Sequence, residues 1–465
     1  SKGNIAEKAV IVDYKHPVDV NVFEADDPDI ILTAIGVKKE ELTLPLFNKA
    51  GAQDRNGAVT CATCHDPHRW RSDSTEGETN KDVKGDHTTS FLRKPSPALC
   101  RECHVNKFSI ANSKHDIQKV APEEKNFAEQ LPSESGLCGV CHIIHGGQKS
   151  YLWGRKISTK TGQGMKDLCV SCHNEGGMGG KKIIKDHSHP INIAPTEKGL
   201  KTTLPLFDSE GKVSKNGVMA CQTCHDPHRW DPTQVISEDH FKVEGTSKNS
   251  FLRLEASPSP RLCENCHPEQ AYVAGTDHDL IVTTPKEKNI AGQTPEESGP
   301  CGACHLVHNG RNKIKLWAQG FGSGKSIMDM MCNSCHSDNG AGKAKIPQID
   351  FHPDNMLITN TGRDVKGTIN YFPIFDSGTG NSMEVGNISC PSCHNVHQWD
   401  PRAHEEGKGN NIEGTSNNSF LRAQTYNLLC VDCHGLDALF RFKYYHDPEE
   451  RVEKRTGPII PIKTR

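Results

Sequence analysis

The sequence has little apolar side-chain area for its length, because only 34% of its 465 residues are hydrophobic and 6% are aromatic. Its mean hydropathy is −0.63, and it contains 41 glycines and 27 prolines. The length allows two to four domains, but a chain this polar cannot build large cores from its own side chains. We therefore expect bound apolar groups to complete the interior.

Long apolar runs and basic clusters are also missing. No stretch approaches the roughly 20 apolar residues that span a bilayer, and Ser1–Asn4 shows no signal peptide, as expected of a mature chain. The formal net charge is −3, so nucleic acid is not an expected partner. These absences favour a chain that is soluble in bulk, with no membrane span.

No cysteine lies outside one motif, Cys-x-x-Cys-His, which occurs ten times and uses all 20 cysteines. Two thiols one short turn apart can add to the two vinyl groups of a porphyrin, and this spacing is typical of c-type haem attachment. The predicted haem-binding thiols are Cys61, Cys64, Cys100, Cys103, Cys138, Cys141, Cys169, Cys172, Cys221, Cys224, Cys263, Cys266, Cys301, Cys304, Cys332, Cys335, Cys390, Cys393, Cys430 and Cys433.

The histidine that ends each motif is the predicted proximal ligand of the iron. These histidines are His65, His104, His142, His173, His225, His267, His305, His336, His394 and His434. The sequence thus predicts ten covalently attached haems as the cofactors. Zinc sites and disulfides also use paired cysteines, but neither requires a histidine directly after the second cysteine.

Haem attachment of this kind takes place outside the cytoplasmic membrane. We therefore expect an exported protein that is extracellular or at the cell surface, with the periplasm as the alternative.

The chain repeats internally. The segment CATCHDPHRW, ending at Trp70, recurs as CQTCHDPHRW at Trp230 and more loosely as CPSCHNVHQW at Trp399. An SFLR element follows each copy, at Ser90–Arg93, Ser250–Arg253 and Ser419–Arg422. We interpret residues 1–185 and 186–349 as four-haem repeats and 350–465 as a truncated repeat with two haems. Stacked repeats produce a quasi-linear object. The alternative is a compact molecule.

Fifteen of the 25 histidines remain after the proximal set, and eleven recur at equivalent places. They follow a motif by three residues, precede a repeat in an HP or similar context, or stand before Asp after a second motif. The predicted second iron ligands are His16, His68, His115, His145, His189, His228, His278, His308, His352, His397 and His446. The other four, His87, His187, His240 and His404, have no counterparts and are expected to be surface residues.

Eleven candidates for ten irons leave one histidine over, and His16 and His446, nearest the ends, are the expected candidates for exchange with a neighbouring chain. A histidine three residues after its own motif is poorly placed for its own iron, so it is expected to bind a neighbouring haem. The SFLR arginines Arg93, Arg253 and Arg422 are expected either to pair with haem propionates or to lie on the surface.

Features of haem enzymes are scarce. The ligand supply leaves no iron that must stay open, no CxxCK motif occurs, and the eight methionines and seven tyrosines hold no repeat-linked positions. Bis-histidine ligation indicates low potentials and electron transfer. No catalytic residue and no enzymatic activity are expected.

At these motifs the chain resembles the multihaem c-type cytochromes with paired CXXCH motifs, including extracellular cytochromes that polymerise into nanowires. The resemblance runs from His16 to His446. It implies bis-histidine ligation, alternating parallel and T-shaped haem pairs, and sparse secondary structure. The expected fold is a multihaem cytochrome c, mostly loops and short helices wrapped around a continuous haem stack, with little β structure.

The expected function is extracellular electron transfer by a decahaem cytochrome that assembles end to end into a conductive filament. Its partners would be other copies of itself, upstream periplasmic or outer-membrane cytochromes and extracellular acceptors. Two alternatives stay open: a monomeric periplasmic or outer-surface electron carrier or conduit, and a multihaem oxidoreductase with one five-coordinate iron. Donor, acceptor, direction of flow, individual potentials and the pairing of each second histidine with a haem are not encoded in the motifs.

Overall fold

The structure is a computed structural model. It describes residues 16–24, 37–71, 85–148, 151–157, 165–233, 242–346, 356–359, 372–401, 415 and 418–423. The chain divides into two compact units, residues 1–183 with 190–254 and residues 184–189 with 255–465. The first unit holds motifs one to five, so the first motif of the second sequence repeat packs with the first repeat. The three-repeat division remains a prediction from the sequence.

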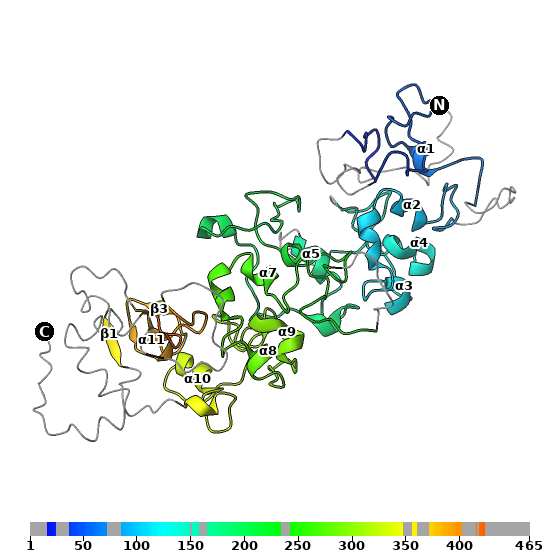
Figure 1. The fold of residues 1–465 in the computed structure, drawn as a ribbon. Coiled ribbons are helices and arrows are strands. Elements are labelled where there is room, and N and C mark those ends of the chain that lie inside the picture. The colour runs from blue at the N-terminus through cyan, green and yellow to red at the C-terminus, as the bar shows by residue number, and fades with distance from the viewer. Residues whose placement is uncertain are drawn as a thin grey trace, which may run out of the picture. The chain divides into compact units, whose positions relative to one another are not determined.

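Short helices separated by loops dominate the described residues (Figure 1). The α-helices are α1 (Cys61–Cys64), α2 (Ala98–Arg101), α3 (Ile117–Val120), α4 (Pro132–Gly139), α5 (Met165–Val170), α6 (Cys221–Cys224), α7 (Arg261–Glu264), α8 (Leu280–Thr283), α9 (Pro295–Gly302), α10 (Ile327–Asn333) and α11 (Cys390–Cys393). The 3-10 turns are η3 (Val105–Ile110), η4 (Gly180–Lys182), η5 (Pro195–Lys198), η6 (Pro268–Val273) and η7 (Lys343–Lys345).

Most of these helices are short because each is built around one CXXCH turn. In α1 the His65 N–H donates to the Cys61 carbonyl at 2.9 Å, which closes the turn. The buried Thr63 hydroxyl accepts the Thr60 N–H at 2.9 Å and so satisfies a donor left free at the helix start. Thr223 and Ser392 repeat this contact in α6 and α11.

The described strands form one small antiparallel sheet of order β1-β4-β2-β3, within the second unit. They are β1 (Leu357–Thr359), β2 (Ile374–Phe375), β3 (Ser382–Met383) and β4 (Val385–Asn387). Leu357 pairs with Asn387, which also pairs with Phe375, and Ile374 pairs with Met383. The prediction of loops, short helices and little β structure is therefore confirmed.

Buried apolar side chains gather in small separate clusters among the described residues. One cluster contains Val22, Phe23, Val37, Leu46 and Val59. Another contains only Leu168, Phe207 and Ala220, with Trp153 packed against them. Clusters of this size hold local segments together but do not amount to a domain core, as the low apolar content of the sequence predicts. None of the helices in the described ranges has the length and hydropathy that crossing a bilayer requires.

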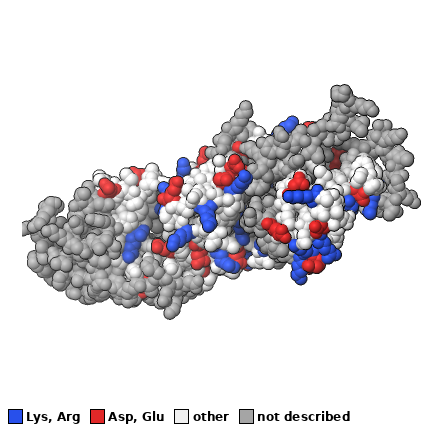
Figure 2. Space-filling model, turned by 90° about the horizontal axis from the view of Figure 1, so that it is seen from above, with Lys and Arg blue, Asp and Glu red and all other residues white. Residues whose placement is uncertain are grey.

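Charged side chains of both signs are interspersed on the face shown in Figure 2. Some form surface ion pairs, such as Lys114 Nζ with Glu244 Oε2 at 3.0 Å. Glu244 also binds Lys182, from a different part of the first unit. Exposed pairs of this kind contribute little to stability, so the backbone contacts around the motifs carry more of the local structure.

Candidate haem sites

Each described CXXCH motif has the same backbone geometry. From the first motif to the ninth, the histidine N–H donates to the carbonyl of the first cysteine at 2.8–3.1 Å. The two cysteines therefore lie at either end of one helical turn, and none of the 18 described cysteines forms a disulfide. Cys61 is exposed and the others are partly buried. Two accessible thiols on one turn are the arrangement that covalent haem attachment requires.

The proximal imidazoles are oriented through their Nδ1 atoms. His65 Nδ1 lies 3.1 Å from the Ser90 carbonyl, and His142 Nδ1 lies 2.7 Å from that of Tyr151. The same contact occurs at His225, His305, His336 and His394. Donation from Nδ1–H to a carbonyl leaves Nε2 unprotonated and free to bind a metal.

Seven proximal histidines lie opposite a histidine from another part of the chain. The ring-centroid separations are all 6.0–6.3 Å. The pairs are His104 with His16, His65 with His145, His173 with His115, His142 with His228, His267 with His189, His336 with His278, and His305 with His397.

This separation fits an iron atom held between the two rings. A metal–imidazole bond is about 2 Å long, and ring bonds of about 1.3 Å place each nitrogen about 1 Å from its ring centre. Two imidazoles on one metal therefore have centroids about 6 Å apart, whereas stacked aromatic rings in contact also occur at about 4.5–5 Å. The narrow range across seven pairs indicates that the residues fit a bis-histidine haem.

Burial keeps several of these imidazoles neutral. It lowers the pKa of His104 and His142, both proximal, to about 4. It also lowers the pKa of three partner histidines, His115, His278 and His397, to about 4. Only the neutral ring has a lone pair for a metal, so burial holds these five rings in the form that binds iron.

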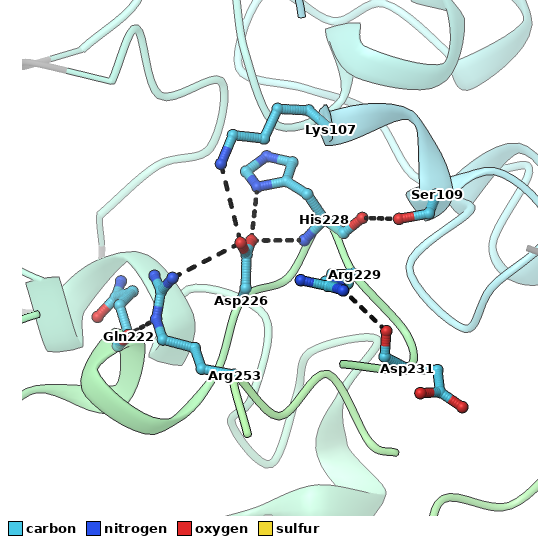
Figure 3. Close-up of polar contacts among 8 residues, drawn as sticks. All are labelled: Lys107, Ser109, Gln222, Asp226, His228, Arg229, Asp231 and Arg253. Atoms are coloured by element: carbon cyan, nitrogen blue, oxygen red, sulfur yellow. Dashed lines mark hydrogen bonds and ion pairs between the residues drawn. The ribbon is translucent and has the colours of Figure 1, made fainter. Parts of the chain in front are cut away.

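An acidic residue, Asp226, orients His228, the second histidine that stands three residues after the fifth motif (Figure 3). His228 Nδ1 donates to Asp226 Oδ1 at 3.0 Å, while Lys107 Nζ and Arg253 Nη1 lie 3.8 and 3.7 Å from Asp226 Oδ2. Burial alone would raise the pKa of Asp226, but the His228 hydrogen bond and the nearby Lys107 charge outweigh it and hold that pKa well below its usual range. The carboxylate therefore stays ionised beside His228.

The SFLR element has a role that sequence reasoning missed. Ser250 and Phe251 both have positive φ, 65° and 61°, an uncommon conformation for residues other than glycine. It is held by backbone bonds to the motif, since the Asp226 N–H donates to the Phe251 carbonyl at 2.7 Å and the Arg253 N–H to the Cys224 carbonyl at 2.8 Å. This turn presents the Ser250 carbonyl to His225.

The SFLR arginines contact the motif backbone, which is a third option beside the propionate and surface roles expected of them. Arg93 Nε donates to the Ala62 carbonyl at 2.7 Å, Arg253 Nε to that of Gln222 at 2.6 Å, and Arg422 Nε to that of Pro391 at 2.7 Å. Each guanidinium thus ties the SFLR element to the turn between the two cysteines. The recurrence of SFLR at a fixed place after the motif was the available signal.

Thiols of neighbouring motifs come into contact in four places. The side chains that meet are those of Cys100 and Cys138, Cys169 and Cys221, Cys263 and Cys301, and Cys332 and Cys390. Each contact joins the first cysteine of one motif to that of the next, so the two attachment turns lie side by side.

Seven of the eleven predicted second histidines belong to these histidine pairs. Those in the seven pairs lie opposite another motif's histidine, and none of the three that belong to a CXXCHxxH segment faces its own proximal ring. The ring of His16, one of the two candidates for exchange with a neighbouring chain, lies 6.1 Å from that of His104 in the same chain. His68 is the exception among the described CXXCHxxH histidines of the DPH or NVH type, because its side chain is 90% exposed.

Some predicted site residues lie outside the described residues: Cys430, Cys433, His434, His352 and His446. His240 and His404, of the four unmatched histidines, also lie there. His87 donates from Nδ1 to the Ser96 carbonyl at 2.8 Å and packs against Gly136, and His187 accepts the Gly310 N–H through its carbonyl. Neither lies opposite a proximal histidine in the described part of the chain.

Comparisons with known proteins agree with this geometry. Residues 131–178 match the family model of the doubled CXXCH motif. Over 243 residues the chain is 22% identical to the multiheme cytochrome MtrA of Shewanella baltica, covering 52% of this chain and 59% of that protein. Over 193 residues it is 28% identical to the dissimilatory sulfite reductase MccA of Wolinella succinogenes, covering 38% of this chain and 25% of that protein. No solved structure matches significantly.

The matched segments thus span less than two thirds of either relative. One relative is named as a multiheme cytochrome and the other as a sulfite reductase. The paired motifs, the helical turn of each CXXCH and the opposed histidines support the same assignment from the chain's own residues. The chain therefore carries the paired CXXCH motifs of the multihaem c-type cytochromes, and its own residues fit covalently attached haems.

Proposed function

We propose that the chain binds ten c-type haems, each with two histidine ligands, and conducts electrons outside the cytoplasm as an extracellular cytochrome that assembles end to end. The observation that carries this proposal is the set of seven opposed histidine pairs at 6.0–6.3 Å. An iron with a histidine on each side has no open position for a substrate. It can change oxidation state without exchanging ligands.

When bound, the haem iron supplies one-electron chemistry by cycling between ferric and ferrous states. The chain's own residues hold the geometry constant through that change. Carbonyls such as that of Tyr151 fix the ring of His142 through Nδ1, and burial keeps the ring neutral. Fixed ligands require little reorganisation on electron transfer, which favours conduction over bond-making chemistry.

The count of ten rests on the repeated motif. Cys430, Cys433 and His434 have the same spacing as the nine described motifs, and we assign them a tenth haem. Repeat equivalence extends the second-ligand assignment to His308 and His352. His446 is the counterpart of His115 and His278, which face the fourth motif of their repeats, and the two-haem repeat has no fourth motif. Nine second histidines are thus assigned within one chain, and the tenth iron is proposed to take its second histidine from a neighbouring copy. Residues 1–185, 186–349 and 350–465 are proposed as repeats of four, four and two haems. Intact mass of the purified protein tests the count: ten haem additions support it, and fewer overturn it.

The extracellular filament is supported by the long spacers, the loop-rich fold and the linear repetition of haem units. A heterologous contact between copies that does not close generates such a filament. Electron microscopy of the natively purified protein tests this part. Uniform filaments whose axial repeat holds one chain support it, whereas discrete particles at all concentrations favour a monomeric periplasmic or outer-surface carrier.

A multihaem oxidoreductase with one five-coordinate iron is the second candidate, and the match to the sulfite reductase MccA favours it. Carbon monoxide binding to the reduced, natively assembled protein separates the two candidates. A bis-histidine set binds almost none, because carbon monoxide needs a vacant iron position. One carbon monoxide per chain in the assembled protein would favour the enzyme and contradict a purely conducting role.

A further inference from the structure

The CXXCHxxH segment and the SFLR element form the same surface in each repeat. In the second repeat this surface consists of Asp226, His228 and Phe251. Its counterpart in the first repeat consists of Asp66, His68 and Phe91, which we call the repeat-1 docking surface. The local sequence HDPHRW is identical in both, and His68 Nδ1 lies 3.0 Å from Asp66 Oδ1, as His228 Nδ1 does from Asp226 Oδ1.

In the second repeat, residues of the first repeat cover this surface. Ser109 Oγ donates to the His228 carbonyl at 2.9 Å, and Lys107 Nζ lies 3.8 Å from Asp226 Oδ2 (Figure 3). The His115 ring lies 4.1 Å from the Phe251 ring. Through these contacts His228 reaches His142 of the preceding repeat, with ring centroids 6.0 Å apart.

The third repeat is covered in the same way by the second. His278, the counterpart of His115, lies 4.3 Å from the Phe420 ring. His397, the counterpart of His228, lies 6.1 Å from His305. Two of the three copies of this surface are therefore occupied by a preceding repeat, each with an aromatic contact and an opposed pair of histidines.

The repeat-1 docking surface lacks such a cover among the described residues. The His68 side chain is 90% exposed, against 26% for His228. Phe91 is 41% exposed, against 8% for both Phe251 and Phe420. Asp66 links the two exposed side chains, because its N–H donates to the Phe91 carbonyl at 2.7 Å and its carboxylate orients His68. This surface can therefore receive a segment of the same kind, with its own histidine and haem.

We propose that the repeat-1 docking surface receives the C-terminal repeat of a second copy of this chain and that His68 binds a haem iron of that copy. This proposal rests on the proposed bis-histidine function and specifies how copies assemble. The occupant is argued from the repeat itself. His446-Asp447 is the sequence counterpart of His115-Asp116 and His278-Asp279, the segments that cover the surface in the other copies.

Such a contact is heterologous, because the N-terminal repeat of one chain meets the C-terminal repeat of another. Heterologous contacts that do not close produce filaments. The same surface that joins consecutive repeats within the chain would then join consecutive chains. Because the two-haem repeat has no counterpart of His142 or His305, His68 would bind one of the two haems that this repeat does hold. The expected assembly is therefore head to tail.

The test uses the haem-loaded full chain in three variants, His68→Ala, Phe91→Glu and the control Val213→Glu. Val213 is 58% exposed in the second repeat and lies outside the docking surface. Electron microscopy and sedimentation should show that His68→Ala and Phe91→Glu abolish end-to-end assembly, while Val213→Glu leaves it intact. EPR should show about one high-spin haem per chain in separated chains that is absent from the wild-type assembly.

A photo-reactive amino acid at position 91 identifies the occupant. Linkage to peptides of residues 424–465 of a second copy supports the proposal, and linkage to another protein overturns it. Unchanged assembly and spin state in His68→Ala also overturn it, and so does a wild-type protein that stays monomeric. After either of these two outcomes, the proposed bis-histidine ligation still holds if the wild-type protein, assembled or monomeric, binds no carbon monoxide. Carbon monoxide binding by the assembled wild type would instead contradict the proposed function.

Discussion

The HDPHRW segment occurs once in each of the first two repeats, with the same hydrogen bonds and different surroundings. Both copies close the CXXCH turn and point the second histidine with an aspartate at 3.0 Å. Yet the His228 side chain is 26% exposed beside His142, whereas the His68 side chain is 90% exposed. Local sequence thus determines the conformation of the second histidine, and the preceding repeat supplies the histidine that lies opposite His228.

The largest expected difference between the two copies concerns the spin state of the haems. In separated single chains, His228→Ala should convert about one further haem per chain from low to high spin, because the iron on His142 loses its second ligand. His68→Ala should leave the spin state of those chains unchanged. EPR of the oxidised proteins measures both. A new high-spin signal in dilute His68→Ala would show that His68 binds an iron of its own chain.

Loss of the SFLR arginine should lower the free energy of unfolding by the same amount in the first two repeats, because its contacts are local. Arg93→Ala and Arg253→Ala each remove charged hydrogen bonds to the motif turn, worth about 1.5–3 kcal/mol. Urea unfolding of the haem-loaded protein should show a similar loss for each variant. Substitution by lysine is the matched control for charge. A much larger loss at Arg253 would mean that the neighbouring repeat, and not the turn, depends on this side chain.

The third copy, HNVHQW, lacks two charges that HDPHRW carries, since Asn395 and Gln398 stand in place of the aspartate and the arginine. Asn395 replaces the aspartate and contacts His397 Nδ1 at 3.3 Å. A carboxylate makes its imidazole partner a stronger donor to iron and stabilises the ferric state. We therefore expect Asp226→Asn to raise the potential of one haem and Asn395→Asp to lower that of another.

A tenfold change in ferric over ferrous preference corresponds to about 59 mV for one electron, and shifts of about that size are expected. Spectroelectrochemical titration of each variant against the wild type measures them. Opposite signs in the two variants are the diagnostic result. Shifts of the same sign would mean that solvent access, rather than the charge beside the histidine, sets the potential.

The motif predicted what is local. One turn holds the two thiols and the proximal histidine, so the spacing alone identified Cys61, Cys64 and His65, and low apolar content predicted the small clusters. The histidine pairs could not be assigned in this way, because His142 and His228 meet through a contact between repeats that no spacing within a repeat encodes. The role of SFLR was missed for a related reason: its function depends on a backbone conformation, with φ of 65° at Ser250.

The smallest expected effect is at Ser109, whose hydroxyl donates to a backbone carbonyl of the HDPHRW segment in the second repeat. Ser109→Ala removes the hydroxyl that donates to the His228 carbonyl at 2.9 Å, a loss of about 1 kcal/mol. Because the His228 ring keeps its Asp226 hydrogen bond, the haem should stay low-spin while the first unit unfolds at slightly lower urea. Since the His68 carbonyl has no such donor among the described contacts, Ser109→Ala should not alter the HDPHRW segment of the first repeat. A change of spin state would mean that the ring of His228 is aimed from the preceding repeat as well as by its own aspartate.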